Sequence, residues 1–199
     1  MTLTKERSVW WATLAIVALA LAGCGANAPV IMPMNYPSAA EAAPTAPAAM
    51  SRASGACAVR IAEVRDQRTD PHLLGDTTRQ PVRVEDSGAW IRSAVQSLNG
   101  ASGFRFVDQP VVDGGELVLN VELLKAYTMH MATDRAATVV IKVKYSRHGA
   151  PIDEQIYRGA ENSVNWSNGA SETRASLNTA LGKILPALNK DILRYCPMR

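Results

Sequence analysis

Alternation of apolar and polar residues in the second half of the chain is the feature that most restricts its fold. Between residues 116 and 131, nearly all odd positions are apolar and polar residues stand between them. A period of two is that of a strand with one buried face. The apolar residues are Leu117, Leu119, Val121, Leu123, Tyr127, Met129 and Met131. We therefore expect one long half-buried strand, with Thr128 and His130 on its polar side.

Two further extended runs follow the first. Residues 138–146 alternate again, with Lys142 and Lys144 on the polar face. Residues 147–151 predict a turn, and a third run covers residues 152–166. Adjacent strands with one apolar and one polar face indicate an antiparallel meander whose polar face meets solvent.

Two segments have helical spacing instead. After Asp86 or Ser87, either of which fits an N-cap, apolar residues recur every three or four positions up to Leu98. A C-terminal helix with one apolar stripe begins near Ser171. Pro186 inside this stripe predicts a kink or a split of the helix.

The order of the elements defines the fold class. An early strand over 56–65 and a short strand over 104–107 give the order strand, helix, short strand, three long strands, helix. Helices with a single apolar stripe must cover the apolar face of a sheet. We expect one α+β domain over residues 56–199, with two layers: a mostly antiparallel sheet of four to five strands, and two helices packed on one face.

The N-terminus has the pattern of a bacterial lipoprotein leader. Lys5 and Arg7 precede an apolar run that ends in the sequence LAGC at residues 21–24. Small residues allow a signal peptidase to cut before the cysteine, and the cysteine thiol takes a diacylglyceryl group. We expect residues 1–23 to be a signal peptide and Cys24 to be the lipidation site.

A retained transmembrane helix is the alternative for this leader. The apolar stretch from about residue 9 to residue 22 is shorter than the ~20 residues that a spanning helix needs. Lipoproteins kept in the inner membrane commonly have aspartate after the lipidated cysteine, and this chain has Gly25. By resemblance to that sorting rule, we expect the outer membrane, with the domain in the periplasm and the lipid as its anchor.

The segment after the leader differs in composition from the rest. Residues 25–55 are rich in alanine and proline and nearly free of charge, so a flexible linker is expected over 24–55. A flexible coil of this length spans ~30 Å. The whole chain has 21 basic and 18 acidic residues, a balance that gives no argument for a nucleic-acid partner.

Two cysteines remain besides Cys24. Cys57 stands at the beginning of the expected domain and Cys196 near its end. In an oxidising compartment an even pair is expected to form a disulfide, here across a loop of about 140 residues. The alternative is two separate buried thiols, because cysteine is often buried.

The order of elements resembles that of the YajG-type bacterial lipoproteins. The features that resemble the family are the DQRTD run at 66–70, the helix that ends near Leu98, the long strand that begins at Leu117 and the YRGA step at 157–160. The resemblance covers most of residues 56–195. It implies an outer-membrane lipoprotein whose biochemical role is not established.

No motif for catalysis or metal binding is present in the sequence. None of the three histidines, His72, His130 and His148, has metal-ligand spacing, and there is no nucleophile elbow or phosphate-binding glycine loop. His130 is expected to be solvated. We expect no enzyme, and no cofactor besides the covalent lipid.

Two groups of charged residues are candidates for interaction. Asp66, Arg68 and Asp70 could bind a cation or a polar partner group; in the alternative they form a turn, with acids capping backbone N–H groups and arginines pairing the acids. Lys142 and Lys144 could bind an anionic partner on the open sheet face, or the face is simply solvated. Further cations that could converge there are Lys125, Arg135 and Arg147.

Two functions of different classes remain. In the first, the domain is a tethered, non-catalytic interaction module that binds an envelope protein. In the second, it is a lipid-binding auxiliary lipoprotein of an envelope ABC-type transport system. An apolar groove between sheet and helices would then be lined by Met129, Met131 and Trp166, whose alternative role is core packing.

Overall fold

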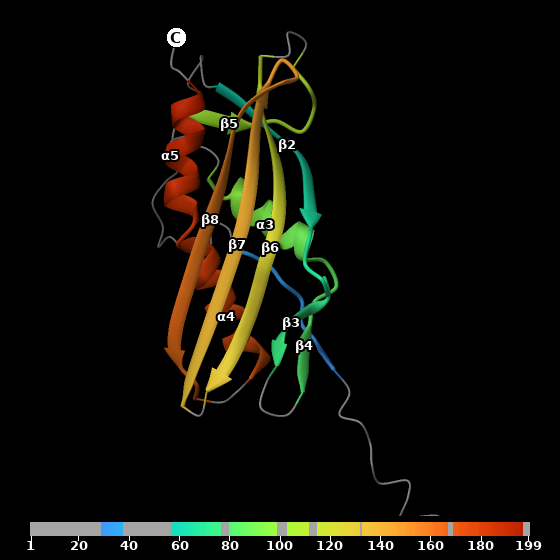
Figure 1. The fold of residues 1–199 in the computed structure, drawn as a ribbon, viewed down its shortest axis with the longest axis vertical. Helices are drawn as coiled ribbons and strands as arrows, with labels where there is room; N and C mark the ends of the chain where they lie inside the picture. The colour runs from blue at the N-terminus through green and yellow to red at the C-terminus, as the bar shows by residue number, and fades with distance from the viewer. Residues whose placement is uncertain are drawn as a thin grey trace, which may run out of the picture.

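Three long antiparallel strands form the largest part of the molecule (Figure 1). They are β6 (Leu117–Met131), β7 (Asp134–Arg147) and β8 (Ala150–Val164), as their alternation predicted. His148 and Gly149 form the β7–β8 turn with φ angles of 51° and 77°. Positive φ at both positions gives the two-residue turn that matches the twist of a hairpin. The computed structural model describes residues 29–37, 57–76, 80–98, 103–111, 115–131, 133–166 and 169–196.

The sheet as a whole is mixed and has eight strands within the described residues. This corrects the expected mostly antiparallel sheet of four to five strands. β2 (Cys57–Asp66) runs parallel to both β6 and β5 (Phe104–Phe106). The physical reason is α3 (Ser87–Gln96), which follows β2 in the chain, because a helical crossover returns the chain in the same direction.

Three short strands were not predicted. They are β1 (Val30–Ile31), β3 (Leu73–Asp76) and β4 (Pro81–Arg83). β3 runs parallel to β6 and antiparallel to β4, and β1 runs parallel to β4. Runs of two to four residues are too short to show a period, so alternation could not reveal them.

Residues 29–37 belong to the folded domain, although they lie inside the expected linker over 24–55. Met32 is 2% exposed, and Tyr36 packs against the core. The Met32 amide also donates to the carbonyl of Arg83 at 2.8 Å. The apolar residues at 30–32 were the signal within this alanine- and proline-rich stretch. Contacts of the domain therefore begin well before residue 56.

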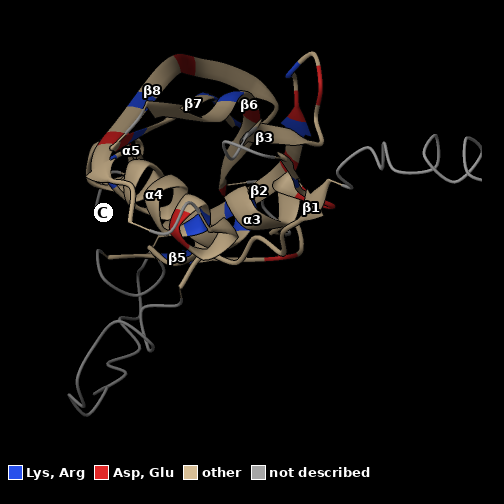
Figure 2. Cartoon of the chain, turned by 90° about the horizontal axis from the view of Figure 1, so that it is seen from below, with Lys and Arg blue, Asp and Glu red and all other residues tan. Residues whose placement is uncertain are grey.

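The helices lie inside the curl of the sheet, which confirms the α+β class (Figures 1 and 2). Asp86 is the N-cap of α3 and accepts a hydrogen bond from the Ala89 amide at 2.8 Å. The C-terminal helix is split into α4 (Ala170–Gly182) and α5 (Leu185–Tyr195), with Pro186 in the first turn of α5. The predicted break at this proline is confirmed.

Close approach of α4 to β8 depends on Gly159. A Cβ built on Gly159 would lie 1.8 Å from the carbonyl oxygen of Ala180 in α4. The fully buried Trp90 of α3 donates its Nε1 hydrogen to Asn178 Oδ1 of α4 at 2.8 Å, which joins the two helices. Glycine in β8 therefore sets the distance between the two layers.

A β-bulge in β6 reverses the side-chain pattern predicted for its second half. The register shifts between Leu123 and Lys125, opposite two consecutive residues of β7. Beyond this point Thr128 is fully buried, whereas Met129 and Met131 are each 48% exposed. One extra residue moves every following side chain to the other face. The expected placement of these residues was therefore wrong.

Candidate functional site

The DQRTD run forms a buried group of hydrogen bonds at the end of β2, which we name the Asp66–Arg68 cluster. Arg68 donates to both carboxylate oxygens of Asp66, with Nε–Oδ1 at 2.9 Å and Nη2–Oδ2 at 2.6 Å. Ser87 Oγ of α3 also donates to Asp66, at 2.5 Å. The guanidinium reaches the carbonyls of Leu73 in β3 and Ala126 in β6, at 2.7 and 3.2 Å. Asp66 and Arg68 therefore join four elements, as in the turn interpretation.

The pKa of Asp66 and the burial of both side chains agree with a structural role for the Asp66–Arg68 cluster. Burial raises the pKa of Asp66, but the hydrogen bonds from Arg68 and Ser87 outweigh it and leave that pKa below its usual value. The Asp66 and Arg68 side chains are only 13% and 7% exposed. Asp70 is more accessible: it caps the His72 amide at 3.0 Å and lies 3.8 Å from Arg83 Nη2.

Lys142 and Lys144 lie on the outer face, which we define as the side of β6, β7 and β8 away from the helices. Both Nζ atoms lie 2.6 Å from the Glu122 carboxylate, one on each oxygen. Hydrogen bonds from the two lysines lower the pKa of Glu122. Glu154 adds a second carboxylate 3.9 Å from Lys142 Nζ. The charges are thus nearly balanced, which favours a polar or mixed-charge partner over a purely anionic one.

A hollow of 270 Å³ adjoins this charged network. It brings together side chains of β2, β6 and β7, and Arg65 Nε is paired with Glu63 at 2.5 Å. Its lining residues are Glu63, Arg65, Asn120, Val121, Glu122 and Lys144. The hollow and the network together form a polar concave surface that includes two predicted site residues, Lys142 and Lys144.

Arg135, one of the cations that could have converged on the outer face, lies elsewhere. Arg135 is 1% exposed and donates to His130 Nε2 at 3.0 Å, and to Asn165 Oδ1 and Glu172 Oε2 at 2.5 Å each. His130 therefore faces inward and is not a solvated strand residue. The parity of Arg135, shared with the buried Val139 and Ile141, was the available signal.

A tyrosine cluster ties α5 to the sheet and was not anticipated. The Tyr145 and Tyr157 hydroxyls lie 2.6 Å apart, and Tyr157 donates to Asp191 Oδ2 at 2.6 Å. Tyr195 donates to Asp153 in β8. Burial raises the pKa of Tyr145 and of Tyr157 far above the usual value. Both hydroxyls therefore stay protonated at neutral pH and act as structural hydrogen-bonding groups.

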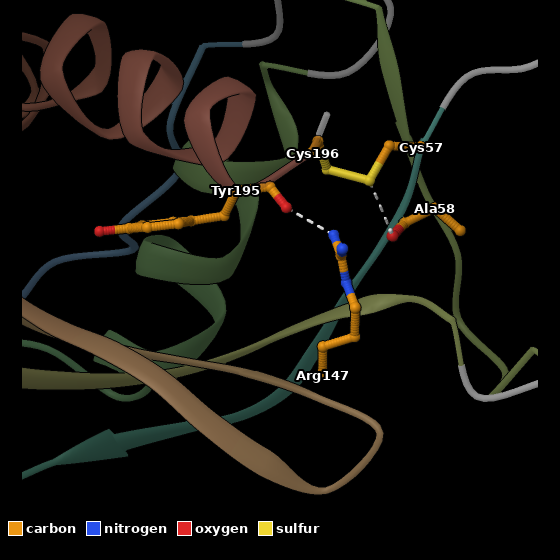
Figure 3. Close-up of a disulfide and its surroundings, with 5 residues drawn as sticks. All are labelled: Cys57, Ala58, Arg147, Tyr195 and Cys196. Carbon is orange, nitrogen blue, oxygen red and sulfur yellow. Dashed lines mark hydrogen bonds between the residues drawn. A yellow bond between two sulfur atoms is a disulfide. The ribbon is translucent and has the colours of Figure 1, made fainter. Parts of the chain in front are cut away.

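A disulfide joins Cys57 and Cys196 across a sequence separation of 139 residues (Figure 3). It connects the first residue of β2 to the C-cap of α5. Arg147, at the end of β7, donates to the Tyr195 carbonyl at 2.5 Å beside it. The lipidation site expected at Cys24 lies outside the described residues.

The predicted lipid groove is not where the sequence placed it. Met129, Met131 and Trp166 do not line a space between sheet and helices, because the first two point outward after the bulge and Trp166 is 85% exposed. A groove of 660 Å³ lies instead beside α4 and residues 36–37. Its lining residues are Tyr36, Pro37, Ser97, Asn178, Thr179, Gly182, Lys183 and Pro186.

The described ranges contain neither a metal-binding group of side chains nor a membrane-spanning helix. Within them, no three or more His, Cys, Asp or Glu side chains are grouped so that they could hold a metal ion. No helix in the same ranges combines the length and apolar character needed to cross a bilayer.

Comparison with known proteins shows the fold but no family. No family model and no curated protein matches the sequence. A protein of Xanthomonas campestris, described as belonging to the family DUF330, superposes with a TM-score of 0.52 at 13% identity, over 83% of this chain and 95% of that one. An uncharacterised protein gives a TM-score of 0.51 at 10% identity, over 83% and 99%. At such identities the similarity shows a shared fold only.

Proposed function

We propose that this chain is an outer-membrane lipoprotein of the YajG type, anchored by lipid on Cys24, whose periplasmic domain is a non-catalytic interaction module. The observation that carries the proposal is the LAGC sequence at 21–24, followed by Gly25 rather than aspartate. The domain adds support, because Asp66, Arg68 and the buried tyrosines are engaged in bonds between elements.

Two single substitutions test the lipid anchor and the membrane to which the protein is sorted. Cys24→Ser should abolish lipidation and release a folded domain from the membrane fraction. Gly25→Asp should keep the acyl mass but move the protein from outer to inner membrane on a density gradient. Intact mass checks the lipid in each variant. Membrane association of Cys24→Ser would contradict the lipid anchor, and an unmoved Gly25→Asp would contradict the sorting assignment.

The charged network of the outer face, which consists of Glu122, Lys142, Lys144 and Glu154, is the proposed contact for an envelope protein. Lys144 is 45% and Glu154 50% exposed, so both can exchange partners without loss of core packing. Charge complementarity contributes mainly to specificity in such contacts. Crosslinking in cells should capture a partner with the wild type and lose it with Lys142→Glu/Lys144→Glu. Arg105→Glu, on the exposed side of β5, should keep it; equal loss in both variants would reject this surface.

A lipid-binding auxiliary role is the second candidate. The 660 Å³ groove is within the usual range of small-molecule sites, and it is the observation that favours this role. Native mass spectrometry should then detect a copurified lipid that is lost when Thr179→Trp fills the groove. A wild-type protein without bound lipid would remove this candidate and leave the interaction module.

A further inference from the structure

The outer face is charged around Glu122 and becomes apolar toward the β6–β7 turn. Met131, Asp134 and Val164 lie in one row across the three strands, and Met129 and Ala136 pair in the next row. Trp166 follows two residues after Val164. The exposed fractions are 48% for Met129, 48% for Met131, 50% for Val164 and 85% for Trp166. We name these four residues the apolar tip.

The apolar tip is held in place by the backbone. The bulge between Leu123 and Lys125 turns Met129 and Met131 outward. The Asn165 amide donates to the Thr133 carbonyl at 2.7 Å, which fixes the residue before Trp166 beside the β6–β7 turn. Isolated exposed apolar side chains are ordinary, but a group of large ones on one end of a domain marks a contact surface.

The N-terminal segment enters the domain at this same end. β3 runs parallel to β6, β4 antiparallel to β3, and β1 parallel to β4, so β1 begins at the end where β6 finishes. In Figure 1 the N-terminal described segment, drawn in blue, extends toward this lower end of the molecule. The five residue steps from Cys24 to Pro29 span at most ~18 Å. A lipid on Cys24 therefore keeps this end near the bilayer.

We infer that the apolar tip contacts the surface of the lipid bilayer, with Trp166 at the level of the headgroups. This inference rests on the proposed anchor at Cys24. Tryptophan is enriched at membrane interfaces, where its apolar ring and its N–H are both accommodated. Asp134, between Met131 and Val164, remains in the hydrated headgroup layer. The domain is then oriented on the membrane and presents its charged network away from the lipid.

The mature chain contains its own reporter for this contact. Removal of residues 1–23 leaves two tryptophans, the fully buried Trp90 and the exposed Trp166. The lipidated protein is reconstituted in phosphatidylethanolamine and phosphatidylglycerol vesicles with or without brominated acyl chains. We expect Trp166 emission to be blue-shifted in both kinds of vesicle and quenched only where the acyl chains are brominated, whereas Trp166→Phe retains an unquenched Trp90 signal that also reports folding.

Matched substitutions locate the contact. Met129→Thr/Met131→Thr should lose most of the quenching. Ile152→Thr/Ile156→Thr removes equally exposed side chains of the outer face, 43% and 63% exposed, but farther from the tip, and should retain it. A lipidated, vesicle-bound wild type without quenching, or equal loss in both variants, would overturn the inference while the anchor stands. Trp166 that becomes shielded from solvent as the protein concentration rises, in the absence of vesicles, would show that the apolar tip contacts a second copy of the chain. That result would also overturn the inference. Absence of acyl mass on Cys24 would instead refute the anchor itself.

Discussion

Removal of the Cys57–Cys196 disulfide should destabilise the domain strongly, because it closes nearly the whole folded chain into one loop. The sequence separation is 139 residues. In the chain-entropy relation a 100-residue loop is worth about 4.7 kcal/mol at 25 °C, and this longer loop gives about 5 kcal/mol. Measured losses for native disulfides are about 2–5 kcal/mol, and we expect Cys57→Ser/Cys196→Ser to fall in the upper part of that range.

Urea denaturation of the oxidised wild type and the double variant measures this loss. With a slope of about 2 kcal/mol per molar urea for a domain of this size, the midpoint should fall by roughly 1.5–2.5 M. Wild type treated with a reductant is the matched control and should coincide with the variant. A midpoint shift below about 0.5 M at an unchanged slope would show that the bridge does not restrict the unfolded chain, and would refute the reasoning.

Four further substitutions test the packing of α4, the hydrogen bonds between Asp66 and Arg68, and the bulge in β6. Gly159→Ala should cost about 3 kcal/mol or more by calorimetry, because its Cβ has no room against α4; a neutral effect would contradict this close approach. Asp66→Asn should cost about 3 kcal/mol at pH 7, since it leaves Arg68 buried without its anion. The pKa of Asp66 is lower in the folded than in the unfolded protein. Its contribution to the free energy of unfolding is therefore present above the unfolded pKa near 3.9 and is lost as the pH falls through the folded pKa. Asp66→Asn should consequently lose less stability on acidification than the wild type. An equal acid loss in both proteins would reject this role. Thr128→Lys should cost about 3 kcal/mol or more, and Met129→Lys no more than about 0.5 kcal/mol; the reverse ranking would refute the bulge.

Periodicity predicted the long elements well, because each is long enough to repeat its pattern several times. The extended runs that became β7 and β8 lie within a few residues of their predicted bounds, Asp86 is one of the two predicted N-cap candidates, and the helix is split at Pro186 as predicted. The pattern failed inside β6, where both halves alternate but a single inserted residue changes which parity is buried. Sequence alternation contains no marker for such an insertion, so Met129 was assigned to the wrong face.

The candidate site was predicted less completely, since it depends on contacts between distant elements. The turn role of the DQRTD run was foreseen, but not that Arg68 would reach Ala126 in β6, 58 residues away. The buried position of Arg135 agrees with its parity in β7 but conflicts with its charge, and it depends on partners distant in sequence, such as Glu172 at the start of α4. The parallel pairing of β2 likewise required knowledge of where the crossover through α3 ends.

The position of the two bridged cysteines also orders the events of folding. The β6–β7–β8 meander pairs residues that are close in sequence. It can therefore form before β2 pairs with the edge of β6 that lies opposite β7. Cys57 begins β2 and Cys196 follows the last turn of α5, so their sulfur atoms meet only when both late elements are seated. Oxidation of this pair is consequently a chemical record of completed folding. A chain in which this pair has been oxidised is thus one in which β2 and α5 have both reached their places.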